Sequence, residues 1–139
     1  MPRISSGLCL ILALAPVLAC APDRNSGGDA ERHLAKLTPL GQPVPDSLDR
    51  KEGDTTDWKL LDIQDTGYLN VEVVLDNPEA EVMVEAFDRY GQRIGRTVHR
   101  KDDGPVVKLS AEVVIGKGFL RITHLGGPKT GYTLKAFVR

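Results

Sequence analysis

Residues 67–75 read GYLNVEVVL, the clearest secondary-structure pattern in the chain. Apolar residues occupy every second position, at Leu69, Val71, Val73 and Leu75. Successive side chains of a β-strand point to opposite faces, so this period of two places all four on one face. An amphipathic helix would instead repeat its apolar residues at three and four positions. These residues therefore predict a half-buried β-strand.

Similar alternation recurs on both sides of this stretch, between turns rich in Gly, Pro, Asn and Asp. Three prolines within residues 38–48 restrict any strand there to a short one at a sheet edge. No helical pattern of normal length follows residue 40. Seven or eight short strands of this kind predict an all-β fold, an antiparallel β-sandwich or jelly roll. The other expected strands lie at 57–63, 81–88, 92–100, 106–114, 117–124 and 131–139.

The composition fits one globular domain. The 139 residues carry 18 Lys+Arg and 19 Asp+Glu, a formal net charge of −1. Charged residues make up 27% and hydrophobic residues 41%, as in ordinary folded domains. A nucleic-acid-binding protein would show a basic excess, so no nucleic-acid partner is expected.

The N-terminus has the features of an export signal. Arg3 precedes the apolar run LCLILALAPVLA at residues 8–19. A dozen apolar residues suit the core of a signal peptide and fall short of the roughly 20 that span a bilayer. The run ends in VLAC at residues 17–20, which resembles the lipobox of bacterial lipoproteins. The alternative is an ordinary secretory signal that ends near a cysteine.

The lipobox resemblance implies cleavage before Cys20 and acylation of that residue, so that fatty acyl chains anchor the protein in a membrane. In a Gram-negative cell, Ala21 in place of Asp implies delivery to the outer membrane. Residues 1–19 are then the signal peptide, and residues 20–37 form a polar, flexible tether to a folded domain at 38–139. Cys9 leaves with the signal and Cys20 carries lipid, which excludes a catalytic or metal-binding cysteine.

Several short motifs follow one another along residues 38–139. GDTTDW at 53–58 leads into a strand, GYLNV begins the strand at 67, residues 82–91 form a hairpin ending in Tyr-Gly, and GFLRI at 118–122 precedes GYTL at 131–134. In this order they resemble the bacterial pre-peptidase C-terminal (PPC) domains. The resemblance implies a small jelly-roll-like sandwich without catalysis, usually appended to exported enzymes. Relatives bind collagen or polysaccharide, some with calcium.

Calcium is the better-supported metal, because His33, His99 and His124 are scattered and lack the spacing of a zinc site. Calcium requires six to eight oxygen ligands, several of them from carboxylates. Asp54, Asp57 and Asp76 are candidates that could gather at one end of the sandwich. The favoured interpretation is that they form turns and keep the surface soluble. No metal or other cofactor is therefore expected.

The last two strands carry the main candidate binding surface. With Leu120 and Leu134 inward, the outward residues include Phe119, Arg121, Lys135 and Phe137. If the two strands pair, these four share one exposed face, and binding surfaces are enriched in aromatic residues and Arg. The alternative is that another segment covers the two phenylalanines.

A secondary basic patch lies on one polar hairpin, at Arg89, Arg93, Arg96 and Arg100. Guanidinium groups pair well with carboxylates and phosphates. The alternative is a charged edge strand that prevents edge-to-edge aggregation.

Together these features predict a non-catalytic, exported lipoprotein that acts as a protein-interaction or structural module of the cell envelope. Its expected partners are the membrane, through the lipid anchor, and an envelope protein. The alternative is a carbohydrate- or cell-wall-binding module that binds a polysaccharide. An envelope hydrolase has the least support, since there is no G-x-S-x-G nucleophile motif. The single tryptophan, Trp58, is expected in the core.

Overall fold

The computed structural model describes residues 27–139. The expected signal segment and Cys20 lie outside this range. The described residues form nine strands and two single turns of 3₁₀ helix, η1 (Arg32–Leu34) and η2 (Arg50–Glu52). The strands are β1 (Lys36–Leu37), β2 (Val44–Leu48), β3 (Thr56–Ile63), β4 (Gly67–Leu75), β5 (Glu81–Phe87), β6 (Arg93–His99), β7 (Val106–Val113), β8 (Gly116–Gly126) and β9 (Thr130–Val138).

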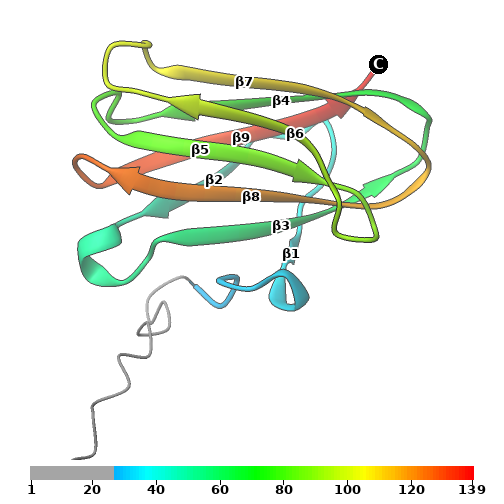
Figure 1. Ribbon diagram of the computed structural model, residues 1–139, viewed down its shortest axis with the longest axis horizontal. Helices are drawn as coiled ribbons and strands as arrows, with labels where there is room; N and C mark the ends of the chain where they lie inside the picture. The colour runs from blue at the N-terminus through cyan, green and yellow to red at the C-terminus, as the bar shows by residue number, and fades with distance from the viewer. Residues whose placement is uncertain (1–26) are drawn as a thin grey trace, which may run out of the picture.

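The strands form two sheets that pack face to face (Figure 1). One has five strands in the order β1-β3-β8-β5-β6, and the other has four in the order β2-β9-β4-β7. All neighbours are antiparallel except β1, which pairs in parallel with β3. The predicted antiparallel β-sandwich is therefore confirmed. Eight of the nine strands fall in the eight stretches where strands were expected, and β1 is the one strand that was not expected.

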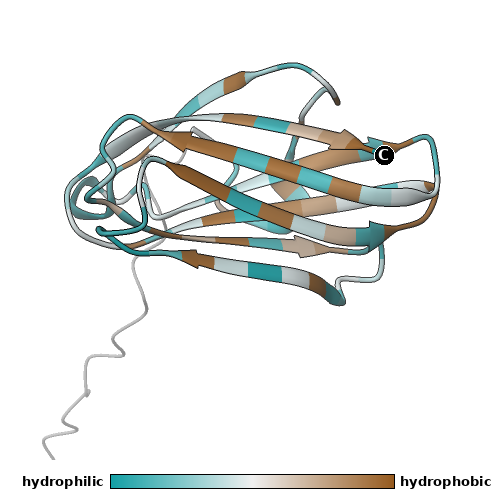
Figure 2. Ribbon diagram, turned by 90° about the horizontal axis from the view of Figure 1, so that it is seen from above, coloured by the Kyte–Doolittle hydropathy of each residue, from teal (hydrophilic) through white to brown (hydrophobic). Residues whose placement is uncertain are grey.

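The alternation predicted from the sequence creates the core. Figure 2 shows hydrophobic and hydrophilic residues alternating along the strands. In β4, Leu69, Val71, Val73 and Leu75 are all buried, and they pack against apolar residues of the facing sheet. Each buried aliphatic side chain of this size contributes about 1.5–3 kcal/mol, so the inward rows supply the main driving force for folding.

Sheet edges lie where the sequence permits them. β2 pairs only with β9, and its exposed Pro45 can make no ladder hydrogen bond through its nitrogen. β6 is the edge of the five-stranded sheet and presents exposed Arg93 and Arg96. Both observations agree with the expected positions of a proline-containing edge strand and a charged edge strand.

The folded domain begins before residue 38, within the segment expected to be a tether. Asp29 is fully buried, and its carbonyl oxygen accepts a 2.8 Å hydrogen bond from the Trp58 backbone N–H. Lys36 and Leu37 then add to the edge of the five-stranded sheet as β1. A polar composition suggested flexibility, but partners in β3 hold this segment in place.

Helical structure in the described range is limited to the two short turns η1 and η2. Among residues 27–139, none of the helices could cross a membrane.

Candidate functional site

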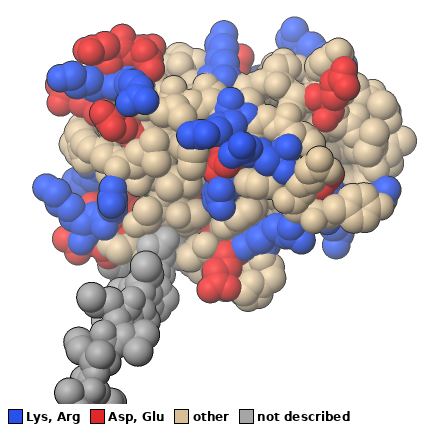
Figure 3. Space-filling model, in the orientation of Figure 1, with Lys and Arg blue, Asp and Glu red and all other residues tan. Residues whose placement is uncertain are grey.

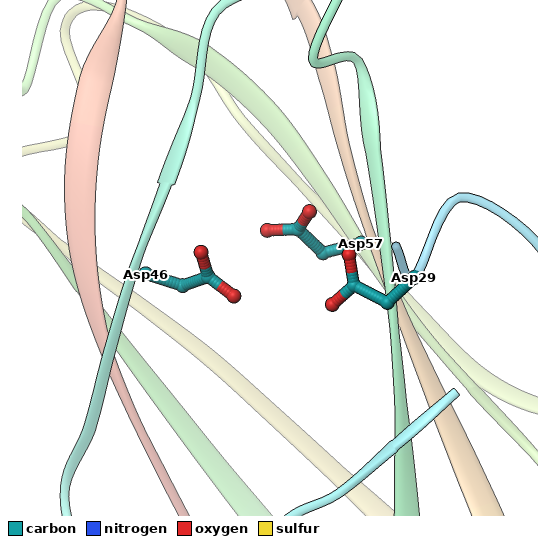
Figure 4. A group of neighbouring side chains, drawn as sticks. All are labelled: Asp29, Asp46 and Asp57. Carbon is teal, nitrogen blue, oxygen red and sulfur yellow. The ribbon is translucent and has the colours of Figure 1, made fainter. Parts of the chain in front are cut away.

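A cluster of charged side chains is buried between the sheets at the edge formed by β2 and β3. Asp57 and Lys59 of β3 have the same inward parity as the core residues Leu61 and Ile63. Figure 4 shows the carboxyl groups of Asp29, Asp46 and Asp57 pointing toward one another from three segments. We call these three residues, together with Lys59 and Tyr132, the buried cluster.

Lys59 joins the segments of the buried cluster. Its side chain is only 2% exposed, and its Nζ donates to Asp29 Oδ2 at 2.8 Å and to Asp46 Oδ2. The hydroxyl group of Tyr132, on β9, donates a hydrogen bond to Asp57 Oδ2 at 2.5 Å. The cluster thus links the N-terminal segment, both sheets and the edge strand β2.

Burial sets the protonation of this cluster. It raises the pKa of Asp57 from 3.8 to about 8, because desolvation disfavours the charged carboxylate. The hydrogen bond from Tyr132 opposes this rise, and the negative charges of Asp46 and Asp29 add to it. Burial disfavours the Lys59 ammonium, yet its hydrogen bonds to Asp29 and Asp46 raise its pKa above 10.5. At neutral pH, Asp57 therefore carries a proton and Lys59 a positive charge.

The three carboxyl groups could hold a cation by distance alone, since one oxygen from each lies within 4.8 Å of the others. Calcium requires six to eight oxygen ligands. Here the Lys59 ammonium already binds two of the three carboxyl groups, those of Asp29 and Asp46, and its charge would repel a cation placed between them. The cluster therefore fits a buried lysine and does not fit calcium.

A second group of charged residues lies on the outer surface of the five-stranded sheet. Trp58, Arg121, Glu85 and Arg96 lie side by side in one row across β3, β8, β5 and β6. Arg93 lies nearby on β6. We call this surface, with Arg93, Arg96 and Arg121 around Glu85, the arginine face. Figure 3 shows basic side chains gathered near the middle of this side of the molecule.

Glu85 organises the arginine face. Its side chain is nearly inaccessible, and Oε1 accepts from Arg121 Nε at 2.9 Å and Nη2 at 2.6 Å. Oε2 accepts from Arg93 Nη1 at 3.3 Å. The Arg121 guanidinium also lies over the Trp58 and Phe87 rings, at 5.2 and 5.1 Å from their centroids. One carboxylate and two aromatic rings thereby fix the positions of two arginines.

The main candidate surface from the sequence is divided between the two sheets. Phe119 and Arg121 lie on β8 in the five-stranded sheet, whereas Lys135 and Phe137 lie on β9 in the other sheet. β8 and β9 do not pair, so the four residues do not form one surface. Arg32 of η1 lies 5.2 Å from the Phe119 ring centroid and covers part of that ring.

The secondary basic patch is also divided, along the length of β6. Arg93 and Arg96 join Arg121 on the arginine face. Arg89 lies in the β5–β6 turn over the Tyr90 ring, and Arg100 follows the opposite end of β6. The arginine face therefore combines Arg121 of the main candidate surface with Arg93 and Arg96 of the secondary basic patch.

The comparisons with known proteins agree with this architecture. No protein-family model matches the sequence, and no curated protein matches it. A solved structure, the pre-peptidase C-terminal domain of a collagenase from Bacillus anthracis, is similar with a TM-score of 0.62 and 14% identity. The likeness covers 73% of this chain and 93% of that chain. The fold is PPC-like.

Within the PPC-like sandwich, only one of the three candidate calcium ligands belongs to the buried cluster. Asp57 lies in it, whereas Asp54 bridges to Asp49 before β3 and Asp76 is exposed after β4. Sequence reasoning missed four members of the cluster: Asp29, Asp46, Lys59 and Tyr132. The available signal was two charged residues, Asp57 and Lys59, at the inward positions of an otherwise apolar strand.

Trp58 is buried in the PPC-like sandwich, but it is not in the core between the sheets. It lies on the outer surface beneath Arg121, with its ring centroid 5.2 Å from that of Phe87. The prediction of a core tryptophan was therefore wrong about its location, because its position in β3 alternates with the inward Leu61 and Ile63.

Proposed function

We propose that this protein is a non-catalytic lipoprotein whose PPC-like sandwich binds an acidic protein partner in the cell envelope through the arginine face. The observation that carries this proposal is the grouping of Arg93, Arg96 and Arg121 around the single buried carboxylate of Glu85.

The charge balance of the arginine face favours an acidic partner. Three guanidinium groups surround one carboxylate, which leaves surplus positive charge. Arg96 is exposed and has no ion-pair partner among residues 27–139. Complementary charge on a partner would speed encounter and fix its orientation.

The organisation of the surface favours a protein as the partner. Arg121 and Arg93 are already held in place, so binding costs less side-chain entropy than for freely moving arginines. The half-buried Phe119 places aromatic surface beside these charges, and the buried rings of Trp58 and Phe87 lie beneath Arg121. Arginine and aromatic residues are the side chains most enriched at the centres of protein interfaces.

The lipid anchor is the second part of the proposal. The apolar run at residues 8–19 followed by Cys20 supports acylation of that cysteine. Ala21 supports the outer membrane as the destination in a Gram-negative cell. Replacing Cys20 with Ala removes the thiol that would carry lipid, so both the membrane fractionation and the mass of the mature protein should change.

The partner is tested by a pull-down from detergent-solubilised source cells with the tagged full-length protein. The test variant Arg93→Gln/Arg96→Gln removes two charges from the arginine face. The control Lys108→Gln/Lys135→Gln removes two charges from exposed positions on the other sheet. A stoichiometric acidic protein, lost with the test variant and retained with the control, is expected.

Two outcomes would overturn the protein-binding proposal. One is a partner retained equally by both variants. The other is the absence of any partner together with retention of the wild-type protein on an acidic polysaccharide. If that retention is lost with Arg93→Gln/Arg96→Gln, the arginine face is a carbohydrate-binding site instead.

A further inference from the structure

An apolar pocket lies at one end of the sandwich, the end at which Figure 1 shows the C-terminus. Residues from the β3–β4, β5–β6 and β7–β8 connections surround it. Its volume is about 500 Å³. Small-molecule sites typically measure roughly 300–1,000 Å³. We call this feature the end pocket.

The wall of the end pocket continues the apolar interior to the surface. Ile63, Val113 and Phe87 line it, and all three are buried. Gly118 also lines it; a Cβ there would lie 3.6 Å from the Ile63 side chain, so the glycine leaves room beside Ile63. An apolar ligand entering from solvent would therefore contact surface of the kind that forms the core.

Exposed apolar side chains surround the mouth of the end pocket. Tyr68, Tyr90, Val114 and Ile115 are 54%, 78%, 63% and 60% exposed. They are half of the eight large hydrophobic residues that are exposed within residues 27–139. Isolated exposed apolar residues are ordinary, but a group of them around a concave site indicates a binding surface.

The charged groups at the mouth differ in whether they already have partners. Asp88 Oδ1 accepts from the backbone N–H groups of Tyr90 and Gln92, each at 2.9 Å. Glu112 Oε1 accepts from the Tyr68 hydroxyl at 3.0 Å. Arg89 and Lys117 also line the pocket, and neither forms an ion pair within the described part of the chain. The two carboxylates keep their negative charge but already accept hydrogen bonds, whereas Arg89 and Lys117 are the cations available to an anionic ligand.

We propose that the end pocket binds a small amphiphile, with an apolar chain against Ile63, Phe87 and Val113 and an anionic head group at Arg89 and Lys117. The apolar wall accounts for the chain, and the two unpaired cations account for the anion. This site shares Phe87 with the surroundings of the arginine face, but none of Arg93, Arg96 and Arg121 lines it, so it does not depend on the protein partner proposed above.

Calorimetric titration with dodecanoate, below its micelle concentration, tests this site. The chain used is residues 20–139 with Cys20→Ser, which keeps every residue of the described structure and needs no detergent. Circular dichroism with a strand signal confirms that it is folded. Saturable binding of one dodecanoate is expected, and the Arg89→Gln/Lys117→Gln variant should weaken it at least about tenfold.

Trp58 provides an independent signal. It is the only tryptophan in the chain, and it packs on Phe87, which lines the end pocket. Saturation should therefore change its fluorescence at the same dodecanoate concentration that saturates the heat signal.

The control Arg100→Gln/Lys108→Gln removes the same charge from positions that do not line the end pocket and should bind dodecanoate like the wild type. Dodecylamine, with the same chain and a cationic head group, should bind at least tenfold more weakly than dodecanoate. No saturable binding of dodecanoate, an equal loss in both double variants, or equal affinity for dodecylamine would each overturn the proposal.

Discussion

The buried cluster and the arginine face use the same chemistry at different depths in the sandwich. In the first, one lysine that is 2% exposed lies among three aspartates between the sheets. In the second, one glutamate that is 1% exposed lies among three arginines on the outside. Each buried ion is held by groups of opposite charge, but only the second arrangement presents its surplus charge to solvent. The first therefore acts on stability, and the second is available to a partner.

Removing the buried cation should have the largest effect. The Lys59→Met variant keeps the length of the side chain but leaves Asp29 and Asp46 without their shared hydrogen-bond donor. Breaking a buried ion pair by removing one partner typically costs about 3–5 kcal/mol. The free energy of unfolding, measured with urea, should fall by about that amount.

Lys36→Met is the matched control for this experiment. Lys36 also faces Asp29, at 4.0 Å, but its side chain is 49% exposed. A solvent-exposed ion pair contributes about 0–1 kcal/mol, so this variant should unfold almost like the wild type. Equal losses in the two lysine variants would contradict the distinction by depth.

The pH dependence of stability should also come from the buried cluster. The pKa of Asp57 is raised from 3.8 to about 8 in the folded protein, so between these values the folded state binds a proton that the unfolded state lacks. The contribution to stability is thus complete below about pH 4 and is lost as the pH rises through about 8. Its slope is at most about 1.4 kcal/mol per pH unit, the limit for one proton.

Asp57→Asn isolates this contribution, because the amide keeps the shape of the side chain and an oxygen that can accept from Tyr132. Urea unfolding of both proteins between pH 5 and pH 8 should show the wild type losing stability relative to the variant. Parallel curves would show that Asp57 ionises normally in the folded protein.

On the arginine face, the smaller effects should separate stability from binding. Arg121→Ala removes two hydrogen bonds to Glu85 and the cation above Trp58. Hydrogen bonds to charged groups contribute about 1.5–3 kcal/mol, and Arg93 still pairs with Glu85, so a loss of about 2 kcal/mol is expected by urea unfolding.

Arg96→Ala should change stability least, by about 0.5 kcal/mol or less, since Arg96 is exposed and unpaired within residues 27–139. If the proposed acidic partner binds the arginine face, the same substitution should slow its association, measured by surface plasmon resonance at low and high salt. If Arg96→Ala unfolds as easily as Arg121→Ala, then Arg96 has a structural role that the described contacts do not include.

The sequence predicted the strands and their inward faces well, because both follow from local alternation. Val71 and Leu109, for example, belong to rows whose apolar residues recur at every second position, and both are buried. The prolines of residues 38–48 likewise predicted that β2 lies at an edge, because each proline lacks the backbone N–H that a strand inside a sheet donates.

Strand partners could not be predicted in the same way. Leu120 and Leu134 are both buried, as their alternation requires. That pattern does not say whether β8 and β9 belong to one sheet, and here the connection between them crosses from one sheet to the other. Phe119 was therefore wrongly expected beside Phe137.

The buried cluster depended on still longer-range information. Asp57 and Lys59 were recognisable as charges on an inward face, but their partners were not. Asp46 is 13 residues from Lys59 in sequence and Asp29 is 30 residues away, within a segment whose composition predicted a tether. The segment is held by the buried ammonium of Lys59, by a backbone hydrogen bond from Trp58 and by the pairing of β1 with β3.

The position of Asp29 has a mechanical consequence. A pull on the chain that enters at Gly27 reaches Asp29 first, then β1, and then β3 through its parallel pairing. β3 pairs with β8, which carries Arg121, so a load between the N-terminal segment and the outer surface of this sheet runs through β3. The Lys59–Asp29 ion pair is the first side-chain interaction that such a load meets. It resists peeling of the N-terminal segment before tension reaches the central strands.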